Sequence, residues 1–322
     1  MMNFFPLLLY IFSLVIGLGT IFIAFEIYKK YQVGYLSIYL YYSIAFTISG
    51  FINLIGRFLA FSILASSTRD SRMTINLMFG FLVFPFMLAA LYFFINLMWE
   101  LSEKRLSRLI KRGYLILSSL LILSLIVLTK NYLDTQELGL TTKVMSAINF
   151  GVICAYVASS LLCFLMAVRI GDDRQRVLAK TISACYFIAF FIGLIFPWEY
   201  IYQYWPNIRP LPMVLLYFCT NLPPLLILRH NLRKYFAEAS TQLGGQAGMA
   251  LFFSRYNLSQ REQEVIRLMI QGKSNKDIES ELFISLHTVK NHIYNIYQKL
   301  GVKNRLQVVS LIRESMTKAE RD

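Results

Sequence analysis

The stretch Met73–Trp99 reads MTINLMFGFLVFPFMLAALYFFINLMW and contains no charged side chain. An α-helix rises about 1.5 Å per residue, so roughly 20 apolar residues cross about 30 Å of hydrocarbon. A single lipid-exposed segment satisfies its own backbone hydrogen bonds only as a helix. This stretch therefore predicts a helix that spans a membrane.

Six other long uncharged stretches lie on either side of it, and together they predict seven spanning helices. The seven stretches are Met1–Phe25, Tyr31–Gly56, Met73–Trp99, Gly113–Thr129, Val144–Val168, Thr181–Trp198 and Pro210–Leu228. The expected fold class is all-α, with a seven-helix transmembrane bundle followed by a small four-helix domain.

The composition supports a membrane protein with one soluble domain. Of the 322 residues, 57% are hydrophobic and 16% are charged, and the mean hydropathy is +0.53. Soluble domains carry about 25% charged residues, so an ordinary soluble globule and a disordered chain are both excluded. The 32 basic residues outnumber the 18 acidic ones, which predicts an acidic partner such as phospholipid or nucleic acid.

Charge density sets the expected domain boundaries. The last 70 residues hold 20 of the 50 charged side chains. A segment rich in Gly and Gln precedes them, and this composition is typical of a flexible tether. We expect a transmembrane sensor domain at 1–236, a linker at 237–253 and a soluble domain at 254–322.

The basic residues predict the orientation, because they concentrate on the cytoplasmic side of spanning helices. Thirteen of those near span ends share a side with the C-terminus, and five lie on the other side. We therefore expect the C-terminus in the cytoplasm and, with seven spans, the N-terminus outside.

Four residues of the membrane half are sensor candidates. Arg57 follows an uncharged run and precedes more apolar sequence, so it is either a functional group at membrane depth or a side chain that snorkels to the interface. Trp198, Tyr202 and Trp205 belong to an aromatic cluster at the outer end of the sixth span. This cluster is either an interfacial belt or the mouth of a site for an apolar or cationic ligand.

The C-terminal segment carries helix start and stop signals in helix-turn-helix order. Two expected N-caps have an acidic residue three positions on, which is the capping-box pattern. The expected caps are Ser259, Ser274 and Ser285, and the expected stops are Gly272 and Gly301. A fourth helix is expected from about Asn304.

The expected third helix has two different faces. Its apolar residues recur at intervals of three and four and form one buried stripe, consisting of Val289, Ile293, Ile296 and Leu300. A second stripe has hydrogen-bonding groups and a cation but no carboxylate, and consists of His287, Lys290, Asn291, Tyr294 and Gln298. Such a face suits the major groove of DNA, although a merely solvated face is the alternative.

This segment closely resembles the LuxR/FixJ-type DNA-binding domain, over about a fifth of the chain. The matching residues are Leu258-Ser259-x-Arg261-Glu262-x-Glu264-Val265, Gly272-x-Ser274-Asn275-Lys276-Asp277-Ile278, Leu282-x-Ile284-Ser285, Thr288-Val289-Lys290-x-His292, Ile296, Lys299-Leu300-x-Val302 and Arg305. The resemblance implies a four-helix bundle whose third helix enters the major groove, and a homodimer on double-stranded DNA.

The resemblance also implies residue roles. Carried over by position, Lys290, Asn291 and Tyr294 face bases, while Lys276 and Thr288 face phosphates. Phosphate is also expected at Ser274, because the amides that follow it begin a helix. Glu279 departs from the family pattern, which usually has a small residue there; either its carboxylate snorkels outward or the two helices open slightly.

The expected function is that of a membrane-bound one-component transcriptional regulator in a bacterial cytoplasmic membrane. Its expected partners are double-stranded DNA, the lipid bilayer with its anionic lipids, and a small-molecule or membrane signal. We expect no enzymatic activity, no cofactor and no metal. The alternatives are a transporter or channel with an attached DNA-binding regulatory domain, and a constitutive regulator that is merely anchored to the membrane.

Overall fold

The computed structural model describes residues 4–59, 69–101, 106–135, 138–171, 173–195, 211–242 and 246–319, and these are all-helical with no strand. They divide into two compact units, one formed by residues 1–22 and 38–226 and the other by residues 23–37 and 227–322. The expected all-α class is confirmed.

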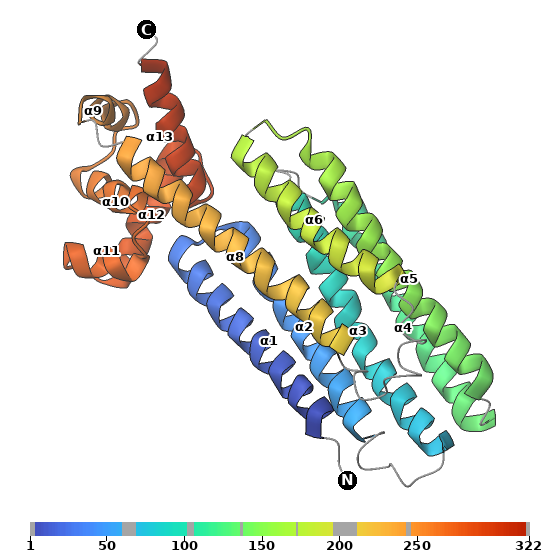
Figure 1. Cartoon of the computed structure of the whole chain (residues 1–322). Coiled ribbons are helices and arrows are strands. Elements are labelled where there is room, and N and C mark those ends of the chain that lie inside the picture. Colours follow the sequence, from blue (N-terminus) through green and yellow to red (C-terminus); the bar gives the residue numbers. More distant parts are fainter. Residues whose placement is uncertain are drawn as a thin grey trace. The chain divides into compact units, whose positions relative to one another are not determined.

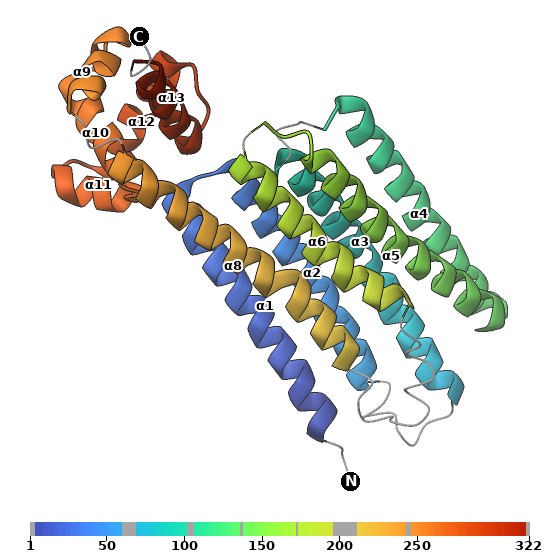
Figure 2. The same ribbon diagram turned by 45° about the horizontal axis from the view of Figure 1, so that its top comes forward.

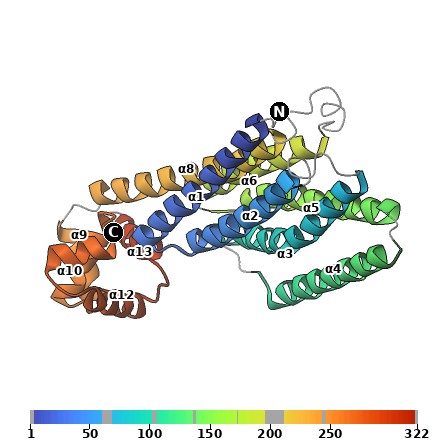
Figure 3. The same ribbon diagram turned by 90° about the horizontal axis from the view of Figure 1, so that it is seen from below.

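The first unit is a bundle of long helices that lie side by side (Figures 1 and 2). Its helices are α1 Phe4–Tyr31, α2 Gly34–Phe58, α3 Arg69–Leu101, α4 Arg108–Thr135, α5 Leu138–Ala167, α6 Asp173–Ile195 and α8 Leu211–Gln242, of which α1, α2 and α8 also contribute to the second unit. α5 packs along α6 and α3, whereas α4 lies on the outside of the bundle (Figure 3).

Aromatic side chains form the core of this bundle. Tyr186 of α6 meets Tyr42 of α2 edge-on at 5.7 Å between ring centroids and Phe94 of α3 at 4.6 Å. Tyr156 of α5 stacks on Phe190 of α6 at 4.4 Å. Because edge-on and offset ring pairs are favourable, these contacts join four helices without any charged group.

Six helices among the described residues are long and apolar enough to cross a membrane, one fewer than expected. They contain the stretches Ile11–Tyr31, Gly34–Gly56, Met78–Leu101, Arg108–Tyr132, Lys143–Ala167 and Gln175–Leu194. The expected seventh span lies in α8, which does form a helix. The side chains at 211–214, where this stretch begins, lie outside the described residues, so the expected seventh span is not tested over its full length.

Much of the apolar surface of the spans faces outward. In α4, only 6% of the most apolar stretch is buried, and Leu115, Leu120 and Ile126 are each about 60% exposed. A soluble protein seldom exposes so large an apolar face, whereas a helix that contacts lipid does. This exposure suggests that α4 is a lipid-facing helix.

The second unit contains the C-terminal domain. Its helices are α9 Gln246–Arg255, α10 Gln260–Ile270, α11 Asn275–Leu282, α12 Leu286–Leu300 and α13 Arg305–Ala319. The unit also takes in the end of α1, the start of α2 and the last part of α8.

The segment expected to be a flexible linker is helical wherever the structure describes it. α8 continues to Gln242, and α9 begins at Gln246. Met249, Phe252 and Phe253 of α9 are buried, and α9 packs against α13. Burial of three large apolar side chains accounts for the difference, because it favours an ordered helix over a solvated tether.

Two aromatic residues connect α1 with α8 inside the second unit. Tyr31, the last residue of α1, stacks on Phe236 of α8 with ring centroids 5.1 Å apart, and both side chains are almost fully buried. Gly272, which follows α10, lies against the same ring: an added Cβ there would be 3.2 Å from the Cβ of Phe236. The C-terminal domain is therefore in direct contact with both helices.

Candidate nucleic-acid interface

The caps expected from the sequence form the ends of the C-terminal helices. Ser259 caps α10 in a complete capping box with Glu262, and Ser274 caps α11 in another with Asp277. Ser285 caps α12 by accepting a hydrogen bond from the N–H of Thr288 at 3.1 Å. Each cap satisfies N–H groups that have no partner within the helix, so the three helix starts are defined locally.

The turn between α11 and α12 places Phe283 in an unusual position. This residue has a left-handed backbone, with φ of +52°, and its side chain is 93% exposed. A non-glycine residue seldom adopts this conformation, but here its N–H bonds the Glu279 carbonyl and ends α11. The residue thereby sets the tight turn of the helix-turn-helix.

The two expected faces of α12 are confirmed. Its buried residues are Val289, Ile293, Ile296 and Leu300. On the other side, Lys290, Asn291 and Tyr294 are exposed, and Tyr294 is 63% exposed. The amide of Asn291 lies 3.3 Å from Nδ1 of His287, one turn earlier. The helix therefore offers solvent a cation and several hydrogen-bonding groups on one continuous face.

The carboxylate of Glu279 turns toward α12. Its Oε1 accepts a hydrogen bond from the N–H of Leu286 at 3.0 Å. A negative charge at a helix N-terminus is favourable, because the free N–H groups there carry partial positive charge. We expected either an outward carboxylate or slightly opened helices. The carboxylate instead contacts the N-terminus of α12, so the side chain bridges α11 and α12.

The other described carboxylates near α12 are also engaged within the domain. Glu262 accepts from Nζ of Lys299 at 2.7 Å, and Glu281 pairs with Lys273. Burial raises the pKa of Glu262, but the hydrogen bonds from Lys299 and from the Ser259 N–H outweigh it and hold that pKa below its usual value. Both carboxylates are therefore paired with basic side chains of the domain.

The three expected phosphate-facing residues lie at the starts of α11 and α12. Lys276 is exposed, and no ion pair of its side chain occurs among the described residues. The hydroxyl of Ser274 accepts from the Asp277 N–H at 3.2 Å, so it acts as a cap. The hydroxyl of Thr288 lies 2.8 Å from that of Ser285. Of the three, only Lys276 presents a cation to solvent.

Arg305, at the start of α13, has a role that the sequence does not reveal. It is fully buried, and its guanidinium donates to Oδ1 of Asn275 at 2.9 Å and to the carbonyl of Lys273. It also donates to the carbonyl of Lys30, at the end of α1, at 3.3 Å. Burial lowers the pKa of Arg305, although it stays charged because Arg is effectively always protonated. Arg305 therefore links α13, the start of α11 and the end of α1.

The sensor candidates lie mostly outside the described residues. The backbone at Arg57 belongs to α2, but its side chain lies outside the described part of the chain. Trp198, Tyr202 and Trp205 also lie outside the described residues. The structure therefore does not test these four predictions.

A short helix, a tight turn and a longer helix with an exposed polar face define a helix-turn-helix DNA-binding domain. Residues 256–312 match the GerE family, described as bacterial regulatory proteins of the luxR family. The chain belongs to this family through its C-terminal domain.

Sequence identity to curated bacterial proteins supports this assignment. The chain is 57% identical over 63 residues to the spore germination protein GerE of Bacillus subtilis, a match that covers 19% of this chain and 85% of that protein. It is 43% identical over 68 residues to the CsgBAC operon transcriptional regulatory protein of Escherichia coli, covering 19% of this chain and 32% of that one.

Further matches are similar in extent. The transcriptional regulatory protein LiaR of Bacillus subtilis is 51% identical over 51 residues, which are 16% of this chain and 24% of that protein. The chain thus spans a third or less of the length of these two larger regulators. No solved structure gives a significant match to the chain.

Proposed function

We propose that the chain is a membrane-bound one-component transcriptional regulator. In this proposal the helical bundle senses a signal, and the C-terminal domain binds promoter DNA. The observation that carries the proposal is the polar face of α12, which belongs to a luxR-family domain on the same chain as six apolar helices of spanning length. The proposed role is regulatory and not enzymatic.

The proposed DNA contacts follow the exposed face of α12. Lys290, Asn291 and Tyr294 would meet base edges in the major groove, where donors and acceptors distinguish the four base pairs. Lys276 and Thr288, together with the amides that follow Ser274, would hold the phosphate backbone on either side. Two copies of the chain would bind paired half-sites as a homodimer.

The proposed topology places the C-terminus in the cytoplasm, where it can reach the chromosome, and the N-terminus outside. This topology requires an odd number of spans, and we propose α8 as the seventh. Tyr217, Asn221 and Leu225 of α8 are buried within the bundle. A span that packs against its neighbours can carry a few polar residues, as α8 does at Asn221.

The contacts inside the second unit support a route for the signal. Tyr31 ends α1, Phe236 lies on α8, and the two stack beside Gly272 of the DNA-binding domain. Arg305 adds a hydrogen bond to the Lys30 carbonyl. A change in how α1 and α8 pack would therefore alter how the DNA-binding domain packs against them. Such a switch needs a free-energy difference of only a few kcal/mol between two states.

Anionic lipid is a proposed competitor for the basic surface of the domain. Each Lys or Arg near an anionic leaflet contributes about 1 kcal/mol to membrane association. When the domain lies on the membrane, Lys276 and Lys290 would contact lipid headgroups, and DNA would compete with the lipid for these two side chains. The proposed resting state is therefore membrane-associated and inhibited.

Genome-wide DNA footprinting with the intact protein in its native membrane tests the proposal. We expect discrete protected sites made of two half-sites, and weaker protection as salt rises, because phosphate contacts release counterions. Protection that is absent or has no sequence preference would contradict a role as a specific regulator.

Replacing residues 1–226 by an unrelated membrane anchor then tests the sensor role. If the bundle senses a signal, the fused domain should occupy its sites but no longer respond to conditions that change occupancy by the intact chain. An unchanged response in the fusion would contradict sensing and favour a constitutive regulator that is merely anchored.

A further inference from the structure

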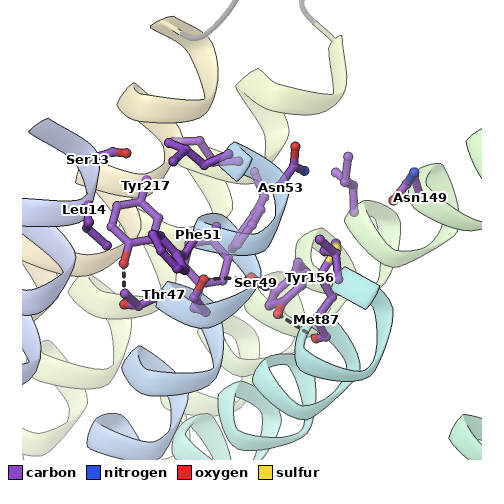
Figure 4. A pocket seen from close by; sticks show the side chains of 17 residues that line it. Ser13, Leu14, Thr47, Ser49, Phe51, Asn53, Met87, Asn149, Tyr156 and Tyr217 are labelled. Carbon is purple, nitrogen blue, oxygen red and sulfur yellow. Dashed lines mark hydrogen bonds between the residues drawn. The ribbon is translucent and has the colours of Figure 1, made fainter. Parts of the chain in front are cut away.

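The helical bundle encloses a cavity of about 270 Å³. It lies within the first unit and is lined by residues of α1, α2, α3, α5, α6 and α8 (Figure 4). Small-molecule sites usually measure about 300–1,000 Å³, so this cavity suits a small ligand or a single alkyl chain.

The lining is apolar and aromatic over most of its surface. Phe46, Phe51 and Phe190 contribute rings, and Val83, Met87 and Ile153 contribute aliphatic surface. The lining residues, all within the described part of the chain, include no Asp, Glu, Lys, Arg or His. An ion would be costly to bury in such a site, because nothing there offsets its loss of hydration.

Several of the polar lining groups are already engaged with the protein. The hydroxyl of Thr47 donates its one hydrogen to the Ser43 carbonyl at 2.6 Å, so it accepts a hydrogen bond from the hydroxyl of Tyr217. The hydroxyl of Ser49 donates to the Phe46 carbonyl at 2.7 Å. These groups therefore have little capacity left for a strongly hydrated ligand.

Two amides give the cavity a polar end. Asn53 of α2 and Asn149 of α5 lie toward the top of Figure 4, whereas the hydroxyls of Thr47 and Tyr156 lie below them. An amide offers both a donor and an acceptor, so it can bind a hydroxyl or a carbonyl group. The cavity thus combines an apolar body with a neutral hydrogen-bonding end.

We infer that this cavity binds an uncharged, mostly apolar molecule with one hydroxyl or carbonyl group, its chain among the aromatic rings and its polar group at Asn53 and Asn149. The inference rests on the proposed function in one respect, because it supplies the class of signal that the bundle would sense. α1 and α8 both line the cavity and both continue into the second unit, so a ligand that alters their packing acts on the helices that carry Tyr31 and Phe236.

Photolabelling of the intact protein in nanodiscs tests the inference without measuring transcription. The probe is an eight-carbon alcohol with a diazirine group, and mass spectrometry locates the labelled residues. We expect labels on the segments 46–54 and 149–156, displaced by 1-octanol but not by the permanently charged octyl sulfate or octyltrimethylammonium. Labels spread evenly over lipid-facing residues, or displaced equally by the charged compounds, would overturn the inference.

Filling the cavity provides the variant test. A Cβ at Gly50 would lie 3.4 Å from the Tyr217 ring, an ordinary contact, so Gly50→Leu should fold while its side chain takes up ligand space. Gly151→Leu on α5 is the control, because an added Cβ there would have open space beyond its own stretch of helix, and Gly151 is not among the lining residues. We expect labelling to fall about tenfold in Gly50→Leu and to stay unchanged in the control.

A second cavity-filling variant and two measurements of folding distinguish a filled cavity from a misfolded protein. Ile153→Phe fills the cavity from α5, and gel filtration together with DNA binding by the C-terminal domain reports folding. Undiminished labelling in both well-folded filling variants would contradict the inference, whatever the protein does to transcription. Failure of the footprinting experiment with labelling intact would instead contradict the proposed function alone.

Native mass spectrometry distinguishes two sources of the same ligand chemistry. A neutral lipid, such as a fatty alcohol or a diacylglycerol, that co-purifies with the wild type and is lost from Gly50→Leu would identify a molecule drawn from the bilayer as the occupant. Specific octanol labelling without a co-purified lipid would identify a free small molecule.

Discussion

The carboxylate of Glu279 accepts a hydrogen bond from the N–H of Leu286 at 3.0 Å, across the turn of the helix-turn-helix. Glu279 belongs to α11 and Leu286 is the first residue of α12. The bond therefore joins the two helices that must keep a fixed angle for α12 to enter a groove. It also brings a negative charge to the positive end of α12.

Replacing Glu279 by Ala should destabilise the C-terminal domain by about 1 kcal/mol, as loss of a helix cap does. A fragment from about residue 246 suits the measurement by urea unfolding, since 63 residues matching this chain make up 85% of the relative GerE. Glu281→Ala is the matched control: its ion pair with Lys273 is on the surface, and such pairs contribute little. Equal losses in the two variants would argue against a capping role for Glu279.

Replacing Lys290 by Ala should weaken binding to the preferred site by roughly 1–3 kcal/mol and relax specificity at one base position. Lys276→Ala should instead weaken binding to all sequences alike and reduce the salt slope by about one. Titrations of the fragment against specific and scrambled duplexes at several salt concentrations measure both. A uniform loss with Lys290→Ala would reassign Lys290 to the phosphate backbone.

Arg305→Ala should destabilise the domain by about 2–4 kcal/mol, because it leaves the Lys273 carbonyl and Asn275 Oδ1 buried without their donor. Arg305→Lys should recover only part of this loss, since an ammonium lacks the forked geometry that reaches two acceptors at once. Thermal unfolding of the fragment measures both. Near-wild-type stability of the Ala variant would mean that these bonds do not hold α13 to α11.

The capping box of α11 predicts loss of stability in acid. The hydrogen bond from the Ser274 N–H holds the pKa of Asp277 below its usual value, with Lys30 and Lys273 assisting. The native state thus binds a proton less readily than the unfolded chain. Its stabilisation is complete above the ordinary carboxyl range near pH 4 and is lost as the pH falls through the native pKa.

Asp277→Asn should flatten this part of the pH profile between about pH 5 and 2, as the substituted residue no longer titrates. Glu262→Gln should act in the same direction, because the pKa of Glu262 is also below its usual value. Urea midpoints across the pH range provide the measurement. A profile as steep in the double variant as in the wild type would place the acid sensitivity elsewhere.

Phe236→Ala should loosen the attachment of the domain in the intact protein. The Phe236 ring contacts Tyr31 and lies against Gly272, so its removal opens a cavity between α8 and the domain. Hydrogen exchange around 272–276 should therefore rise in the full chain. Phe218→Ala, at an exposed position of α8, is the control.

Local features of the C-terminal domain could be predicted in detail. Ser259, Ser274 and Ser285 cap helices where expected, and Gly301 ends α12 with a left-handed backbone. The linker could not be predicted, because its Gly and Gln residues favour a tether locally while the burial of Phe252 and Phe253 favours a helix.

In the C-terminal domain, the sequence alone determined where α10, α11 and α12 begin and which face of α12 is polar, because caps and helical periodicity depend on residues within four positions of each other. The tertiary structure decided what those helices do together. Arg305 reaches Asn275 and Lys30, which lie 30 and 275 residues away, and the cavity draws side chains from six helices. Such contacts arise only when packing brings distant segments together, so no local pattern in the sequence predicts them.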